Sequence, residues 1–392
     1  MRRPDPAAAL LAPAHLELAE SVGAALDAID IDELEWERTG TFPWETFARL
    51  AAEGLTGLTL PAQFGGGDLD RLSAVVAHEQ VARRSLTLGE GVQIALNGPV
   101  YAISRLGRPG LVERLVPDVV AGRSLTAIAI TEDQAGSDLG AIETSFTRTA
   151  DGVRVNGTKC FVTAGALADS AMVLGRWGGE GLEGLGYVVV DRSTPGCEVT
   201  RTWNKMGGNA IPEVVLSFND CEVPDDNIVI GEMPGIDGFK QAMSSYNAMR
   251  LGIAVMCVGA GAGILDHITR HLQARRQFRA PLSQMQGLQW RVARLATRLE
   301  QARLLTYVVA AQTDAGGFPD PVGAAQAKLA ASEVALELAD AAIQFDGWRG
   351  IVSEQEQPSE LIYRQLRGWT IAGGTSESLL NTIGASMLRA PR

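Results

Sequence analysis

The residues best placed for chemistry lie where a strand-like apolar run, Ala127 to Ile130, passes into a polar loop that contains Thr131, Gly136 and Ser137. Such a loop offers backbone N–H groups and hydroxyls that can bind a phosphate or the polar edge of a heterocycle. Taken alone, the segment is also compatible with an ordinary turn. The sequence here predicts either a ligand-binding loop or a plain turn, and other motifs must decide between them.

Metal-dependent and hydrolytic chemistry are not indicated. Among the four histidines, only His267 and His271 have the i, i+4 spacing that lets two rings share one ligand on a helix. Arginines crowd this pair, so we expect a solvated helix face and no metal site. The glycines from Gly259 to Gly263 lie in an apolar helical run and predict close helix packing. Neither a G-x-S-x-G elbow nor a G-x-x-x-x-G-K loop is present.

Composition narrows the class of protein further. The chain has 392 residues and a formal net charge of −12, which argues against a nucleic-acid partner and against attraction to anionic membranes. No uninterrupted apolar run approaches the ~18 residues of a membrane span, so we expect none. The cysteines, Cys160, Cys197, Cys221 and Cys257, are too far apart for a zinc site or a disulfide scaffold. A cytoplasmic protein is the expectation.

The elements that position these residues follow a helix, sheet, helix order. Apolar residues recur at helical spacing up to about Gly122 and again after Gly238. Between them lie short β-rich runs bounded by turn residues, namely Thr126 to Thr131, Ser145 to Thr149, Val153 to Val155, Met172 to Leu174, Tyr187 to Val190 and Val214 to Phe218. We therefore predict an α+β protein with domains at 1–123, 124–232 and 233–392.

Five motifs in this order resemble those of the acyl-CoA dehydrogenase family, which are FAD-containing flavoproteins. The loop at 127–138 is followed by 161–164, by 205–208, by the R-x-x-F block from Arg275 to Gln286, and by 374–377. The resemblance covers nearly the whole chain. It implies an N-terminal helical domain, a middle antiparallel β domain and a C-terminal four-helix bundle.

The resemblance also implies which residues contact FAD. Phe161 would stack on the isoalloxazine ring, and the Thr163 hydroxyl would bond flavin N5. Arg275 and Phe278 would reach FAD across a subunit boundary, which predicts a homodimer or a homotetramer. The full predicted set is Ile128, Ile130, Thr131, Gly136, Ser137, Phe161, Thr163, Arg275, Phe278, Gln344, Gly347, Thr375 and Glu377.

Four positions in the cofactor motifs depart from the family pattern. Phe161 replaces the commoner tryptophan and Ala164 the commoner asparagine. Arg279 stands where the family has glycine, and Trp348 takes another glycine position. The predicted substrate is an acyl thioester carried by coenzyme A or by an acyl carrier protein. The predicted substrate contacts are Tyr101, Tyr246, Arg250 and Gly373.

The catalytic base is the largest departure. Family members remove an α-proton with a glutamate, and the two positions that can carry it are here Gly373 and Met249. One explanation is an α,β-desaturase that takes its base from elsewhere, with Tyr101, Tyr246, Glu132 and Asp133 as candidates. The others are a flavin monooxygenase with room above Gly373, and a subunit whose partner supplies the base. The catalytic residue is therefore left unassigned.

Overall fold

A computed structural model describes residues 6–313, 317–353 and 359–388. The helices are α1 (Pro13–Asp27), α2 (Glu33–Thr39), α3 (Trp44–Ala52), α4 (Arg71–Arg84), α5 (Leu86–Asn97), α6 (Pro99–Leu106), α7 (Pro109–Val120), α8 (Asp237–Ala274), α9 (Gln286–Ala311), α10 (Pro321–Asp346), α11 (Ser359–Arg367) and α12 (Ser376–Leu388). The strands are β1 (Thr126–Ala129), β2 (Ser145–Arg148), β3 (Gly152–Thr163), β4 (Ser170–Arg176), β5 (Leu185–Asp191), β6 (Cys197–Trp203), β7 (Glu213–Pro224), β8 (Ile228–Ile230), β9 (Arg276–Gln277) and β10 (Ala280–Pro281). The predicted helix, sheet, helix order and the α+β class are confirmed.

The chain divides into two compact units. The first combines Met1–Glu37, Arg71–Glu90 and Arg250–Arg392, and the second combines Arg38–Asp70 with Gly91–Met249. The first unit is helical, and the second contains the main sheet. The boundaries at 123 and 232 remain a prediction.

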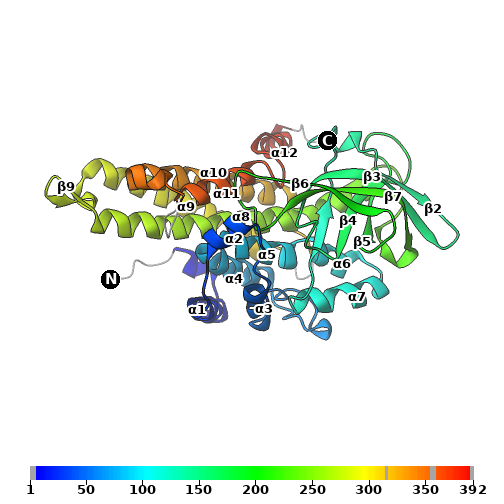
Figure 1. The fold of residues 1–392 in the computed structure, drawn as a ribbon, viewed down its shortest axis with the longest axis horizontal. Coiled ribbons are helices and arrows are strands. Elements are labelled where there is room, and N and C mark those ends of the chain that lie inside the picture. The colour runs from blue at the N-terminus through cyan, green and yellow to red at the C-terminus, as the bar shows by residue number, and fades with distance from the viewer. Residues whose placement is uncertain (1–5, 314–316, 354–358, 389–392) are drawn as a thin grey trace. The chain divides into compact units, whose positions relative to one another are not determined.

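Small residues let the helices of the first unit pack closely. Figure 1 shows α9 and α10 running alongside each other, and α10 buries a row of alanines in the shared core. A Cβ on Gly259 or Gly263 would come within 2.5 or 2.3 Å of a backbone carbonyl of α4. Glycine is therefore required where α8 crosses α4, which confirms the predicted helix packing.

Although no uninterrupted apolar run predicted a membrane span, helix α8 is long and apolar enough to cross a membrane by length and composition. However, 72% of its most apolar window is buried inside the protein. Burial of that kind is typical of a core helix, so α8 alone is weak evidence for a membrane span.

The second unit is built on an eight-stranded sheet with the order β6-β7-β3-β2-β4-β5-β8, and β1 pairs with β4. Most pairs are antiparallel, as predicted, but β1 runs parallel to β4. The longest ladder joins β3 to β7 and has irregularities between Val155 and Gly157 and between Lys159 and Val162. The second irregularity lies beside Phe161 and changes the direction of its side chain.

Candidate functional site

A buried ion pair fastens the polar loop after β1 to strand β3. Lys159 Nζ lies 2.7 Å from Glu132 Oε1 and also donates to the Ile130 carbonyl at 2.7 Å. The Lys159 side chain is fully buried and that of Glu132 is 4% exposed. Glu132 also accepts bonds from the backbone N–H groups of Glu143 and Thr144, at 2.8 and 2.9 Å. Both ends of the loop are thereby held in place.

The same contacts decide the protonation of Glu132. Desolvation by burial raises the pKa of this carboxyl, but Lys159, the Thr144 hydroxyl and the Glu143 N–H together hold it below its ordinary value. The carboxylate is therefore ionised and fully used as an anchor. It is not available as the catalytic base that the sequence analysis considered.

Three cross-strand neighbours form a row on one face of the sheet. Trp203 on β6 and Thr163 on β3 are both register partners of Glu213 on β7. The Thr163 hydroxyl donates to Glu213 Oε1 at 2.8 Å. Because directly paired residues share a sheet face, the three side chains lie side by side.

Phe161 forms an aromatic plate over this row. Its φ of +53° turns the side chain out of the regular strand alternation. The ring stacks on Trp203, with centroids 5.4 Å apart and planes inclined by 24°, while 56% of the side chain stays exposed. The Arg201 guanidinium lies 3.6 Å from the centre of the Trp203 ring.

The row has the chemistry of a site for a flat heterocycle. Trp203 Nε1 and Glu213 Oε2 are buried atoms that make no hydrogen bond to any described residue. Buried polar atoms are normally satisfied, so an unpaired donor and an unpaired acceptor indicate a ligand with polar edges. Together with the exposed face of Phe161, they fit the isoalloxazine ring of a flavin.

The remaining predicted residues of this unit lie in β1, in the loop that follows it, in α6 and in α8. The Thr131 carbonyl accepts the Cys160 N–H at 2.8 Å, which places the start of the polar loop next to Phe161. Gly136 and Ser137 are exposed within that loop. Tyr101 is buried in α6 with the Arg105 guanidinium 5.3 Å from its ring centre, and Tyr246 is half-buried in α8.

In the first unit, two cations hold the glycine turn that replaces the usual base. Arg250 Nε donates to the Gly373 carbonyl at 3.1 Å, and Lys328 Nζ donates to the Gly374 carbonyl at 2.8 Å. Lys328 is fully buried, and burial lowers its pKa to about 8. The two donors therefore fix consecutive carbonyls of one turn.

Gly373 does not leave an empty space. Its φ is +77°, and a Cβ at this position would lie 2.6 Å from Ile253 Cδ1. The open room that the oxygenase alternative required above Gly373 is therefore partly filled by Ile253. Met249 occupies the second position at which the family can carry the base, and its side chain cannot take a proton. Its carbonyl accepts a hydrogen bond from the Gln93 amide at 3.0 Å.

Thr375 caps the helix that follows this turn. Its hydroxyl accepts the Ser378 N–H at 3.2 Å at the start of α12. The pKa of Glu377 in the same turn is lowered, mainly by a hydrogen bond to its own backbone N–H and to a smaller extent by the Thr375 hydroxyl. The polar motif at 374–377 thus forms a helix N-terminus with two polar side chains.

The R-x-x-F block forms a tight hairpin of strands β9 and β10. Its two turn residues, Phe278 and Arg279, have φ of +50° and +68°, as a type I′ turn requires. Phe278 is 90% exposed at the tip. A glycine, which the family has at this position, adopts positive φ without strain. Arg279 adopts the same left-handed backbone conformation although it carries a side chain.

The expected solvated face around His267 and His271 is wrong. His267 Nε2 lies 2.8 Å and His271 Nδ1 3.3 Å from the carboxylate of Asp346, at the end of α10. Asp346 also accepts a bond from Ser359 at 2.6 Å. These contacts anchor the start of the segment that contains Gly347 and the exposed Trp348. Spacing alone could not identify an acidic partner so distant in sequence.

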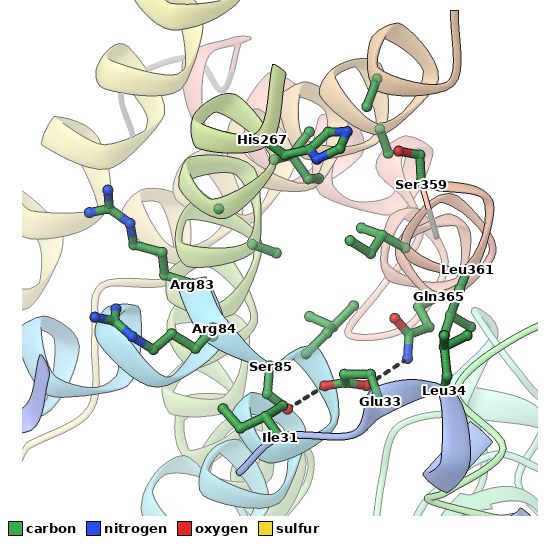
Figure 2. A pocket seen from close by; sticks show the side chains of 18 of the residues that line it. Ile31, Glu33, Leu34, Arg83, Arg84, Ser85, His267, Ser359, Leu361 and Gln365 are labelled. Carbon is green, nitrogen blue, oxygen red and sulfur yellow. Dashed lines mark hydrogen bonds between the residues drawn. The ribbon is translucent and has the colours of Figure 1, made fainter. Parts of the chain in front are cut away.

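The first unit also contains a cavity of about 290 Å³ that no motif predicted. Figure 2 shows Glu33 between Ser85 and Gln365, with both of its interactions drawn as hydrogen bonds. Its second carboxylate oxygen also accepts the Thr87 hydroxyl at 2.7 Å. The polar groups around Glu33 are thus bonded to one another, and the rest of the lining mixes aliphatic side chains with charged ones such as Arg83 and Arg270.

The structure therefore brings together some predicted residues and adds others. Phe161 and Thr163 share one sheet face, and Arg250 and Gly373 share one turn. Sequence reasoning missed Trp203, Glu213, Lys159 and Lys328 as parts of these arrangements. The two lysines could have been noticed from the sequence. Lys159 lies in an apolar strand and Lys328 in an alanine-rich helix, and a lysine buried in either place needs a partner.

Comparisons with known proteins agree with this architecture. Residues 13–123, 127–221 and 236–388 match the acyl-CoA dehydrogenase N-terminal, middle and C-terminal domains. A 3-sulfinopropanoyl-CoA desulfinase of Variovorax paradoxus is 33% identical over 90% of this chain and 88% of its own. An NADH-dependent acryloyl-CoA reductase of Anaerotignum propionicum is 33% identical over 88% of this chain and 86% of its own. The butyryl-CoA dehydrogenase of Megasphaera elsdenii superimposes with a TM-score of 0.87 and 29% identity, covering 97% and 99% of the two chains.

Proposed function

The chain belongs to the acyl-CoA dehydrogenase family, and from this premise we propose that it is an FAD-dependent oxidoreductase that acts on an acyl-CoA thioester. The observation that carries the proposal is the exposed Phe161 plate beside two unsatisfied buried polar atoms. When bound, FAD supplies a two-electron acceptor. The relatives named above act on acyl-CoA compounds, which supports the substrate class.

Each unit has residues suited to holding the cofactor. In the second unit, Phe161 would pack against the ring, while Thr131 and Ser137 offer hydroxyls to polar groups. In the first unit, the exposed Arg275 guanidinium can bind a diphosphate and the Phe278 tip can pack on a ring. The proposed arrangement has Arg275 and Phe278 serving the FAD of a neighbouring subunit in a homodimer or homotetramer.

The first test is the visible spectrum of the purified protein, followed anaerobically as saturated acyl-CoA thioesters are added. Bleaching of the flavin band would establish acyl-CoA oxidation. Phe161→Ala should weaken FAD binding by roughly tenfold, equivalent to about 1.4 kcal/mol for a lost aromatic pair. Leu69→Ala, which trims another exposed apolar side chain of the same unit, is the control and should leave FAD binding unchanged. A colourless protein that retains no flavin after incubation with FAD and removal of the unbound cofactor would contradict the proposal.

The missing carboxylate favours one further candidate, a desulfinase-like activity. Desaturation needs a group that takes the α-proton, and neither Gly373 nor Met249 can do so. Loss of SO₂ from carbon 3 of a sulfinoacyl thioester cleaves the C–S bond, and a proton then takes its place, so carbon 2 is untouched. The half-buried Arg250 at the glycine turn carries a positive charge that suits an anionic acyl chain.

The two candidates give different products. Incubation with 3-sulfinopropanoyl-CoA should release sulfite and propanoyl-CoA with no added electron acceptor if the second candidate holds. Saturated acyl-CoA thioesters should then leave the flavin band intact. Bleaching by those thioesters without sulfite release would instead support desaturation and reject the desulfinase candidate.

A further inference from the structure

Glu213 occupies the centre of the row on the sheet, and the sequence motifs did not single it out. It pairs across β7 with Trp203 on one side and with Thr163 on the other. One carboxylate oxygen accepts the Thr163 hydroxyl at 2.8 Å. The other oxygen is buried and has no hydrogen-bond partner among the described residues. The side chain is therefore joined to Thr163 and has one unused oxygen.

The surroundings of Glu213 do not fix it in one protonation state. Lys205 Nζ is the nearest cation, 3.8 Å from Glu213 Oε1, but donates its closer bond to the Ile211 carbonyl at 2.9 Å. On β6, Trp203 is the direct neighbour and Arg201 lies over the Trp203 ring. On β3 the neighbour is the uncharged Thr163. Burial raises the pKa of Glu213 to about 7, against the weaker opposing effects of Lys205 and Thr163.

We propose that Glu213 is a positioning residue whose proton decides the direction of the Thr163 hydroxyl bond, and through it the hydrogen bonding offered to the flavin. The inference rests on the proposed function, in which Phe161 and Thr163 lie against FAD. An ionised Glu213 can only accept, so the Thr163 hydrogen points to the carboxylate and its oxygen is left as an acceptor. A protonated Glu213 can donate to the Thr163 oxygen, which frees the hydroxyl hydrogen to donate outward.

The consequence is a proton-dependent contact beside the cofactor. Between slightly acid and slightly alkaline pH, Thr163 changes from a donor to an acceptor toward the ring. No other described residue of the row can titrate in this range, because Trp203 and Thr163 are neutral and Phe161 is apolar. The bound flavin should report this change, since its absorption depends on hydrogen bonding at the ring edge.

The test is a pH titration of the visible spectrum of the oxidised holoprotein. In the natural protein, the flavin band should shift with a midpoint near pH 7, the pKa of Glu213. Glu213→Gln should remove the shift, which is measured on the fraction of the variant that holds FAD. The control is Glu222→Gln, which changes an exposed glutamate on the same strand that pairs with Arg154 at 2.7 Å, and should keep the shift.

Two further variants keep the test decisive if Glu213→Gln fails to fold or to bind FAD. Thr163→Val removes the hydroxyl that transmits the effect and should abolish the shift, whereas Thr163→Ser keeps a hydroxyl and should retain it. A shift that survives in Thr163→Val, or a bound flavin with no shift in the natural protein, would overturn this inference alone. A protein that binds no FAD would overturn the proposed function instead.

Discussion

Arg279 and Gly373 both have a backbone conformation that ordinarily favours glycine, and they depart from the family pattern in opposite ways. Arg279 keeps a side chain at φ +68°, and Gly373 lacks one at φ +77°. A left-handed conformation costs a residue with a Cβ about 1–2 kcal/mol. Both positions can therefore be tested by exchanging glycine and a side chain.

Arg279→Gly should stabilise the folded protein by about 1 kcal/mol, because it removes the strain at the second turn position of the β9–β10 hairpin. The measurement is the free energy of unfolding in urea, with FAD present at saturation. Gln277→Gly is the matched control, since Gln277 lies on β9 next to the turn and has no positive φ. Gln277→Gly should destabilise the folded protein slightly, because it places a glycine in a strand. An equal change in both variants would show that the turn is not strained.

Gly373→Glu, the substitution that restores the usual carboxylate, should destabilise the protein by about 1–3 kcal/mol. The cause is the positive φ together with the 2.6 Å approach of a new Cβ to Ile253 Cδ1. Ile253→Val removes that methyl group and alone should cost about 0.5–1.5 kcal/mol. In the double variant part of the cost of Gly373→Glu should be recovered. Purely additive effects on the free energy of unfolding would contradict the contact.

At the scale of elements, one buried ion pair helps to attach the loop at 131–144 to β3, beside the backbone bond between Cys160 and Thr131. Lys159→Met should destabilise the protein by about 3–5 kcal/mol, since it leaves the Glu132 carboxylate buried without its cation. Arg154→Met, on the same strand but in an exposed pair with Glu222, is the control and should have little effect. Comparable losses in both variants would argue against a special role for the buried pair.

The same pair gives the stability a defined dependence on acid. The pKa of Glu132 is lowered in the folded state, so in acid the unfolded chain binds more protons than the folded one. Its stabilising contribution is present above the ordinary value of 4.5 and is lost as pH falls through the lowered folded value. In Lys159→Met the free energy of unfolding, measured at several pH values, should therefore fall less steeply in acid than in the natural protein.

Sequence patterns predicted the strands with a long apolar run and missed the polar strand β6 and the very short strand β8 (Ile228–Ile230). The runs at 145–149 and 187–190 match β2 and β5 within a few residues. Strand β6 was missed because most of its side chains are exposed and polar, and β3 was predicted far too short because glycine, lysine and a bulge interrupt its alternation. Phe161 and Thr163 could be identified from a motif. Their partners Trp203 and Glu213 could not, since only strand register brings those residues together.

For the whole molecule, the open question is whether one subunit completes the FAD site of another. Phe278 is 90% exposed at the end of a strained hairpin, which is a costly position for an aromatic ring. Phe161 and Arg275 belong to different units of the chain. If Arg275 acts across a subunit boundary, an FAD site takes these two residues from two copies.

This arrangement predicts complementation between two defective variants. Phe161→Ala and Arg275→Ala should each bind FAD weakly when expressed alone. In mixed oligomers purified through two different tags, roughly half of the sites should combine an intact Phe161 with an intact Arg275 and recover FAD binding. If both residues act within one subunit, every site in the mixture keeps a defect and none recovers. Titration of the purified mixture with FAD, followed by absorbance, therefore separates a shared site from one built within a single chain.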